Sequence, residues 1–310
     1  MSIYQRRSAS STPRIVQMKN RDDFAVFILT HGRADNVVTY KTLRERGYTG
    51  KIYLAVDDED KQIDEYKKRY GKEVVVFSKQ AAIDITDSGD NFGKRNSVVY
   101  ARNYNFVLAE QLGIKYFLQL DDDYSHFYYT FDNDRNYISK HINIKSLDVI
   151  IESMLDFYIE SGATTIAMSQ GGDFIGGEGS TLSTLHREGK FSRKVMNSFF
   201  CSTDRPFKFM GRINEDVNAY AELGIKGHLF ITVPRIRLKQ KPTQSNTGGL
   251  TDIYIDLGTY VKSFYSVMYA PSCVKISEMG VSNRRLHHMV KWKNAVPMIV
   301  PESYRKLSNG

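Results

Sequence analysis

The sequence predicts an α/β protein in which helices flank a doubly wound, mostly parallel sheet. The first observation is a strict alternation of strand-like and helix-like segments between residues 23 and 120. The second is that three of the strand-like segments end in clusters of polar residues. Ligands of doubly wound sheets bind beyond the carboxyl ends of the strands, so these clusters are expected to share one rim.

Each element of this sheet follows from its own local pattern. Residues 23–33 begin as an apolar strand and end in the polar sequence "THGR". The apolar spacing over residues 36–47 predicts a helix that stops at Gly47. The remaining elements alternate in the same way: a strand over 51–60 ending in "DDED", a helix over 61–71, a strand over 73–79, a helix over 94–113 and a buried strand over 114–120.

The composition is that of a globular chain with one large domain, or with one domain and a smaller lobe. Of 310 residues 41% are hydrophobic, and the apolar runs are far shorter than the roughly 20 residues of a membrane helix. The first residues lack the apolar stretch of a secretion signal, and residues 1–22 are expected to form a mobile basic arm. Cys201 and Cys273 are expected to be buried, reduced thiols, which favours a cytoplasmic setting.

Three aspartates stand directly after the strand over residues 114–120. Asp121, Asp122 and Asp123 repel one another, and each is costly to desolvate without a counter-charge. Hard oxygen ligands in a D-x-D arrangement suit Mg²⁺ or Mn²⁺, especially when phosphate oxygens complete the coordination. An acidic turn in water is the alternative, but the apolar strand and the polar neighbouring rims favour metal binding.

Several segments, in the same order along the chain, resemble the metal-dependent glycosyltransferases of the GT-A fold. They are "THGR", "AVDDED", "GKRNSVVYARNYNF" and "LQLDDDY", and the resemblance covers roughly residues 24–223. It implies a Rossmann-like, nucleotide-sugar-binding catalytic domain over residues 23–233. It also implies a basic C-terminal region over residues 234–310 that completes the active site and contacts the acceptor.

The resemblance implies roles for individual residues on the donor side. The "THGR" segment would meet the base of the nucleotide sugar, and Asp57 or Asp58 would contact the base or ribose. Asp121 and Asp123 would hold the metal and the donor diphosphate, with Asp122 directed toward the sugar or ribose. The other residues expected at the donor are Thr30, His31, Arg33, Lys94, Arg95, Arg102, Gly171 and Gly172.

A second pair of carboxylates, Glu215 and Asp216, opens a helix predicted to begin near Asn214. The helix dipole favours acidic residues in a first turn, so capping explains the pair without any chemistry. The pair also resembles the motif with which inverting GT-A enzymes deprotonate the acceptor hydroxyl. General-base work needs a carboxylate within hydrogen-bond reach of that hydroxyl. By this comparison Asp216 is the expected base, ahead of Glu215.

Two later segments have less familiar patterns. The glycine-rich segment 169–194 predicts turns or a close backbone approach to a ligand, and a flexible hairpin explains it equally well. The resemblance implies that this segment lies near the sugar and acceptor. Alternate residues of the segment 235–241 are basic, so an extended chain would place them on one face: Arg235, Arg237, Lys239 and Lys241. That face is either a solvated edge strand or a phosphate-binding surface.

Histidines near the end of the chain are candidates for a further metal ligand. GT-A enzymes often supply a third ligand from a late histidine, which makes His288 or His287 a candidate on resemblance. A structural or phosphate-contacting role explains this pair equally well. His228 is expected to belong to a strand.

The whole pattern, particularly "LQLDDDY" and "LHHMVKW", resembles the phage-encoded TET-associated glycosyltransferases. That resemblance implies transfer of a sugar, glucose being the first expectation, from a UDP-sugar to 5-hydroxymethylcytosine or 5-hydroxymethyluracil. The acceptor would be double-stranded DNA in the cytoplasm of an infected bacterium. A net charge of +8 and a cationic, aromatic C-terminal region suit phosphates and an extruded base. The oligomeric state is not predicted.

Three other functions remain open from the sequence. A nucleotidyltransferase would also use paired aspartates, metal ions and an α/β sheet, but it would incorporate a nucleotide. A glycosyltransferase of polysaccharide or protein would ignore hydroxymethylated DNA. A non-enzymatic DNA-binding protein would need neither metal nor nucleotide, so Asp123→Ala would leave its function intact.

Overall fold

The structure is a computed structural model that describes residues 21–190, 198–240, 261–279 and 284–295. The N-terminal arm expected over residues 1–22 lies outside the described residues except for its last two. Lys241, the last member of the predicted basic face, also lies outside them.

One half of the central sheet is built as the sequence predicts. Its four strands pair in parallel, in the spatial order β3-β2-β1-β4. The strands are β1 (Phe24–Leu29), β2 (Ile52–Asp57), β3 (Val74–Phe77) and β4 (Tyr116–Asp121). The connecting helices are α1 (Val38–Glu45), α2 (Ile63–Tyr70) with the 3-10 turn η1 (Gly71–Glu73), α3 (Lys79–Asp84) and α4 (Val98–Gln111). The α/β fold with helices on a Rossmann-like parallel sheet is therefore confirmed.

The sheet continues past β4 with five further strands. They are β5 (Tyr124–Phe131), β6 (Tyr137–Asn143), β7 (Thr165–Gln170), β8 (Phe199–Ser202) and β9 (Phe230–Gln240), and the full order is β3-β2-β1-β4-β8-β7-β9-β5-β6. β8 is antiparallel to both β4 and β7, and β7 is parallel to β9. The carboxyl ends of β7 and β9 therefore lie on the same rim as those of β1 to β4.

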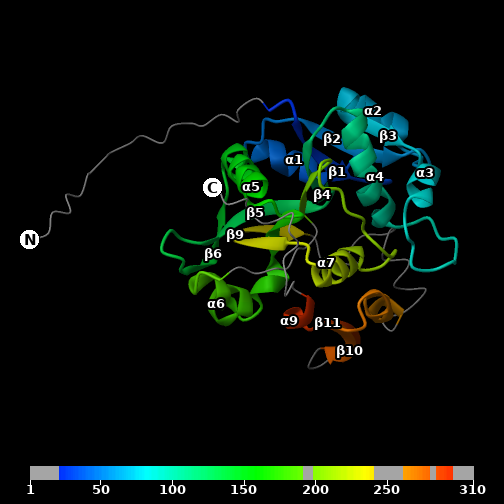
Figure 1. The fold of residues 1–310 in the computed structure, drawn as a ribbon. Coiled ribbons are helices and arrows are strands. Elements are labelled where there is room, and N and C mark those ends of the chain that lie inside the picture. The colour runs from blue at the N-terminus through cyan, green and yellow to red at the C-terminus, as the bar shows by residue number, and fades with distance from the viewer. Residues whose placement is uncertain (1–20, 191–197, 241–260, 280–283, 296–310) are drawn as a thin grey trace, which may run out of the picture.

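Helices cover both faces of the sheet (Figure 1). On one face α1, α2 and α5 (Leu147–Ser161) pack against Val26 and Ile28 of β1. On the other face α4 and α7 (Glu215–Ile225) pack against Ala25 and Phe27. Every residue of β1 is buried, which is typical of a parallel strand covered on both faces.

The described part of the glycine-rich segment, up to residue 190, is helical rather than a hairpin. Its elements are the 3-10 turns η2 (Gly171–Phe174) and η3 (Gly177–Gly179) and the helix α6 (Thr181–Arg187). Gln170 and Asp173 cap η2 reciprocally, and the Ser180 side chain caps α6 through the Ser183 amide. The hairpin alternative is therefore wrong, because these side-chain caps stabilise helical turns where glycine density alone suggested a loop.

The C-terminal elements pack on α7. Residues 261–269 are helical, β10 (Val274–Met279) pairs antiparallel with β11 (Arg285–Val290), and α9 (Trp292–Ala295) follows. The Trp292 ring lies 5.2 Å from that of Tyr220 on α7. Cys201 and Cys273 are buried and free, as predicted. Within the described residues, no helix has the length and apolar character needed to cross a membrane.

Candidate active site

The first polar rim cluster surrounds Asp122, the middle aspartate after β4. Its Oδ2 accepts a hydrogen bond from the Thr30 hydroxyl (2.8 Å), and its Oδ1 accepts one from Arg33 Nη1 (2.7 Å). Burial raises the pKa of Asp122, and the Arg33 charge acts against that rise. The loop that follows β1 therefore engages both oxygens of the side chain that is expected to face the sugar or ribose.

Two residues that sequence reasoning missed hold this cluster in place. Tyr66 of α2 is hydrogen-bonded to the Thr30 hydroxyl (2.8 Å) and accepts the Arg33 backbone N–H (2.9 Å). Thr39 of α1 donates to the Asp121 carbonyl (2.5 Å) and accepts the Tyr124 N–H (2.9 Å). A helical Thr or Tyr gives no local signal of such a role, because its partner lies on another strand.

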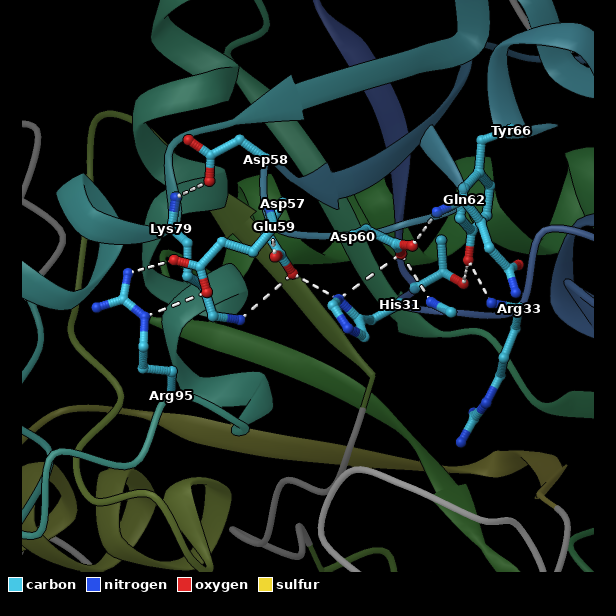
Figure 2. Close-up of polar contacts among 12 residues, drawn as sticks. His31, Arg33, Asp57, Asp58, Glu59, Asp60, Gln62, Tyr66, Lys79 and Arg95 are labelled. Atoms are coloured by element: carbon cyan, nitrogen blue, oxygen red, sulfur yellow. Dashed lines mark hydrogen bonds and ion pairs between the residues drawn. The ribbon is translucent and has the colours of Figure 1, made fainter. Parts of the chain in front are cut away.

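The second polar cluster joins the ends of β1 and β2 (Figure 2). His31 Nδ1 lies 2.8 Å from Asp57 Oδ2, and Lys79 Nζ lies 3.3 Å from the same oxygen. The hydrogen bond to Asp57 raises the pKa of His31. Burial acts to raise the pKa of Asp57, but His31 and Lys79 outweigh it, so the pKa lies below its ordinary value. The Asp57 carboxylate thus lies between the His31 imidazole and the Lys79 ammonium group.

The neighbouring carboxylates bind backbone amides. Asp58 Oδ1 accepts the Lys79 N–H (2.8 Å), and Asp60 Oδ2 accepts the Gly32 N–H (2.7 Å). Gly32 has a φ of +65°, a left-handed conformation that glycine adopts at little cost. Figure 2 shows the Asp60 side chain between the loops that follow β1 and β2. Asp60 therefore fixes the two loops to each other, a role that sequence reasoning did not assign.

The other residues expected at the donor differ in their surroundings. Arg95 pairs with Glu59 (Nη2 to Oε1, 2.5 Å) and with Gln80, as Figure 2 shows for the Glu59 contact. Lys94 is exposed on the loop before α4. Gly171 and Gly172 lie at the carboxyl end of β7, and a Cβ atom added at either would meet nothing within 4 Å. These glycines therefore border open space at the rim.

Arg102 of α4 links the aspartate strand to the second carboxylate pair. Its side chain is 1% exposed, and it donates to Asp121 Oδ1 (2.8 Å) and to Glu215 Oε1 (3.0 Å). Burial acts to lower the pKa of Arg102, but the two carboxylates raise it well above its ordinary value. The structure thus brings the predicted Arg102, Asp121 and Glu215 into one buried, ionic chain.

The amino-terminal end of α7 presents both predicted carboxylates. Glu215 and Asp216 are 4% and 9% exposed. Burial raises the pKa of Glu215 to about 7, with Arg102 acting in the opposite direction. The preceding Asn214 has a φ of 55°, and its amide donates to the Lys262 carbonyl (2.8 Å) and lies 3.3 Å from His288 Nδ1. The C-terminal elements therefore anchor the start of the helix that carries these carboxylates.

Asp123 is the member of the triplet whose environment best fits a cation. Its Oδ1 is buried and has no hydrogen-bond partner among the described residues. Burial, with the charges of Asp121 and Asp122, raises the pKa of Asp123 to about 7. A carboxylate in this situation would be stabilised by a divalent cation, and its hard oxygen suits Mg²⁺ or Mn²⁺. The Asp123 carboxylate therefore fits the expected metal.

The predicted histidine ligands lie elsewhere. His288 is on β11 beside Asn214, at the start of α7. Among the described residues, no three His, Cys, Asp or Glu side chains are gathered as a metal-binding group, so Asp121, Asp123 and His288 do not form one cluster. His228 precedes β9 and contacts Thr164 (3.2 Å), at the opposite end of the sheet from the aspartates. Its expected place in a strand is wrong by two residues.

Comparison with solved structures finds low sequence identity. A mannosyltransferase from Pyrobaculum calidifontis, in complex with GDP-mannose and Mn²⁺, matches with a TM-score of 0.43 and 9% identity, over 74% of this chain and 60% of that one. TarS from S. aureus in complex with UDP matches with a TM-score of 0.40 and 12% identity, over 80% of this chain and 70% of that one. The chain thus spans less than two thirds of the mannosyltransferase. No curated protein matches the sequence.

A family model matches most of the chain. It is described as TET-associated glycosyltransferase, and it matches residues 24–249. That range contains the rim clusters, the aspartate triplet and the start of α7. The chain therefore belongs to the TET-associated glycosyltransferase family.

Proposed function

We propose that this glycosyltransferase transfers a sugar, glucose in the first instance, from a UDP-sugar to hydroxymethylated pyrimidine bases in double-stranded DNA. The acceptor would be the hydroxymethyl group of 5-hydroxymethylcytosine or 5-hydroxymethyluracil. The observation that carries this proposal is the buried chain from Asp121 through Arg102 to Glu215. This chain connects Asp121, which would hold the metal of the donor diphosphate, to Glu215, which stands beside the carboxylate that would deprotonate the acceptor.

On the donor side, Asp121 and Asp123 would hold Mn²⁺ or Mg²⁺. A divalent cation there would neutralise the charge that develops on the leaving diphosphate. The buried Oδ1 of Asp123 supports this assignment, because it has no hydrogen-bond partner within the described ranges of the chain. His31 and Asp57, already paired with each other, would present a polar edge to the base or ribose of the nucleotide.

On the acceptor side, we propose Asp216 as the general base. Glu215 Oε1 already accepts a hydrogen bond from buried Arg102, so Glu215 positions the start of α7. Asp216 follows it in the first turn of the same helix. Asp216 would take the proton of the hydroxymethyl group while that oxygen bonds to the anomeric carbon and the bond to the diphosphate oxygen breaks. Such a direct displacement inverts the anomeric centre.

The test is release of UDP from UDP-glucose in the presence of Mn²⁺. Duplexes containing 5-hydroxymethylcytosine, 5-hydroxymethyluracil or neither would be compared, first with the unchanged protein. The proposal predicts release only with a hydroxymethylated duplex, and loss of that release in Asp123→Asn. The matched control is Asp64→Asn, an exposed aspartate of α2, which should keep full activity.

Other outcomes assign a different function. UDP release that is independent of DNA would retain the glycosyltransferase and overturn the DNA acceptor. Release of pyrophosphate with incorporation of a nucleotide would indicate a nucleotidyltransferase and contradict the proposal. Equal activity of Asp123→Asn and Asp64→Asn would overturn the metal assignment.

A further inference from the structure

Three strands at one edge of the sheet are basic and contain no acidic residue. β9, β5 and β6 lie at the opposite edge from β3 (Figure 1). Not one Asp or Glu occurs within these three strands. Their basic residues are His126, Lys140, His141, Arg235, Arg237 and Lys239. This edge therefore carries an excess of positive charge that the strands themselves do not compensate.

Five residues of these strands form what we call the basic-aromatic face: His126, Tyr128, His141, Arg237 and Lys239. The strand register pairs Tyr128 with Arg237 and His126 with Lys239, which places each pair on the same side of the sheet. The intervening residues of β9 belong to the core on the α5 side of the sheet. The basic-aromatic face is therefore the opposite side of this edge.

The rings of this face are stacked in a row. The His126 and Tyr128 rings have centroids 5.3 Å apart and planes 13° apart. The Tyr128 and His141 rings have centroids 4.6 Å apart and planes 18° apart. Tyr128 is buried, His126 is half-buried and His141 is exposed. The row thus exposes imidazole rings that are held nearly parallel to a buried tyrosine.

Arg237 places a poorly compensated cation beneath this row. Its side chain is 7% exposed, and its guanidinium carbon lies 5.6 Å from the Tyr128 ring centroid and 5.7 Å from that of Phe174. Its Nη2 is buried and has no hydrogen-bond partner among the described residues. A buried guanidinium nitrogen without a hydrogen-bond partner is costly, so the position favours an approaching anion.

The surroundings of His126 are also cationic. Burial lowers the pKa of His126, and the charges of Lys239, Arg46 and His141 lower it further. Lys239 is exposed. The face begins close to the aspartate triplet, because β5 starts at Tyr124 and pairs there with Gln240, the end of β9. A ligand on the basic-aromatic face would therefore extend from the rim that holds Asp123.

We infer that the basic-aromatic face binds the acceptor DNA strand, with Lys239 and Arg237 at its phosphates and the imidazoles stacked on an unpaired base. The occupant rests on the proposed function, because the acceptor there is DNA. Cations that neutralise phosphates and rings that stack on bases are the two elements of single-strand recognition. A neutral polysaccharide would not complement a strand edge that lacks carboxylates.

The test measures DNA binding by fluorescence anisotropy, without donor or metal, over a range of salt concentrations. Lys239→Gln should weaken binding and reduce the slope of log affinity against log salt by about 1, as expected for one lost phosphate contact. The matched control is Lys68→Gln, which removes an exposed lysine of α2 at the other end of the sheet and should leave the slope unchanged.

A second pair of measurements separates stacking from charge. His126→Ala and His141→Ala together should weaken binding of a single-stranded oligonucleotide about tenfold or more, but leave binding of an abasic oligonucleotide of equal length unchanged. Lys239→Gln should weaken both. Equal effects of Lys239→Gln and Lys68→Gln on DNA binding would overturn the inference. So would a histidine variant whose affinity for the abasic oligonucleotide falls as much as its affinity for the normal one.

These outcomes are independent of the sugar transfer itself. The expected binding pattern without UDP release on any hydroxymethylated duplex would support DNA binding at the basic-aromatic face and contradict the proposed function. UDP release together with equal DNA binding by Lys239→Gln and Lys68→Gln would support the proposed function and contradict DNA binding at the basic-aromatic face.

Discussion

The parallel end of the sheet holds its charges in pairs, whereas the antiparallel end holds cations with no carboxylate in its strands. At the parallel end, Asp57 lies between His31 and Lys79, and Arg102 lies between Asp121 and Glu215. At the antiparallel end, Arg237 has a buried nitrogen without a hydrogen-bond partner among the described residues. The first arrangement fixes side chains before any ligand binds, and the second leaves charge for a ligand to neutralise.

Asp123 lies where the two ends meet. It follows the last parallel strand of the first half and precedes β5 of the basic edge. Like the Arg237 nitrogen, its buried Oδ1 has no hydrogen-bond partner in the part of the chain that the structure describes, although its charge has the opposite sign. The comparison therefore separates paired, structural charges from unpaired ones that we assign to ligands, and four predictions test this separation.

The largest expected effect is the loss of a paired charge. Arg102→Met would leave Asp121 and Glu215 buried without their shared cation, so the free energy of unfolding should fall by about 3–5 kcal/mol. Lys239→Gln, which removes an exposed cation, should change it by less than about 0.5 kcal/mol. Urea denaturation of both variants measures the difference.

The double variant Arg102→Met/Glu215→Gln serves as the control for this prediction. It should recover part of the lost stability, because one of the two stranded charges is gone. Equal destabilisation by Arg102→Met and Lys239→Gln would contradict the distinction between paired, structural charges at one end of the sheet and unpaired charges at the other.

The next effect is a gain in the free energy of unfolding when Asp123 is replaced by asparagine. Because its pKa is raised to about 7, the protonated form stabilises the fold fully below the unfolded pKa near 4, and this contribution is lost as the pH rises through 7. Asp123→Asn mimics the protonated form. It should therefore match the unchanged protein at pH 4 and exceed it by about 1–2 kcal/mol at pH 8, a value reduced for partial exposure.

Thermal denaturation with Mn²⁺ sharpens this prediction. The cation should raise the melting temperature of the unchanged protein at pH 8 and have no such effect on Asp123→Asn. A stability difference that grows toward low pH would contradict the assigned direction of the pKa shift.

A smaller effect compares two buried threonines. Thr39 donates to the Asp121 carbonyl and accepts the Tyr124 N–H, so Thr39→Val should cost about 1–2 kcal/mol. Thr130 of β5 is fully buried, and its hydroxyl has no hydrogen-bond partner among the described residues. Thr130→Val should therefore be neutral or slightly stabilising. Chemical denaturation of the two variants decides, and a larger cost at Thr130 would contradict the account.

The smallest effect concerns Arg95. Its guanidinium pairs with Glu59 and Gln80 on the surface, so Arg95→Ala should raise the KM for the UDP-sugar only a few-fold and leave kcat unchanged. Steady-state kinetics measure both constants. A large fall in kcat would show that Arg95 leaves Glu59 to act on the donor during the reaction.

Local patterns predicted the parallel half of the fold because each element has its own period. The apolar run that becomes β4 and the spacing that becomes α4 are both visible in the sequence. α3 was not predicted, since six residues are too few to show a helical period. β8 and the antiparallel pairing of β5 with β9 were not predicted either, because register between distant strands is set by tertiary packing.

Sequence patterns identify many residues of the candidate site, but not the residues with which each of them forms hydrogen bonds or ion pairs. Carboxylates at strand ends and at the start of α7 can be identified from sequence. Arg102 and Glu215, however, are 113 positions apart, and His31 and Asp57 are 26 apart. The resemblance directs Asp122 toward the sugar or ribose, which stays a prediction, and it gives no sign that Thr30 and Arg33 hydrogen-bond to Asp122 in the fold. Such pairings depend on which strands become neighbours, which no local pattern contains.

The central claim is that the paired end and the basic end serve one reaction, in which a sugar passes from nucleotide to base. The most direct test is mass spectrometry of nucleosides digested from a 5-hydroxymethylcytosine duplex after incubation with UDP-glucose, Mn²⁺ and the unchanged protein. The account predicts that the modified nucleoside gains the mass of one glucose unit. Unchanged nucleosides accompanied by free glucose and UDP would contradict it, because the donor would then be consumed without the proposed acceptor.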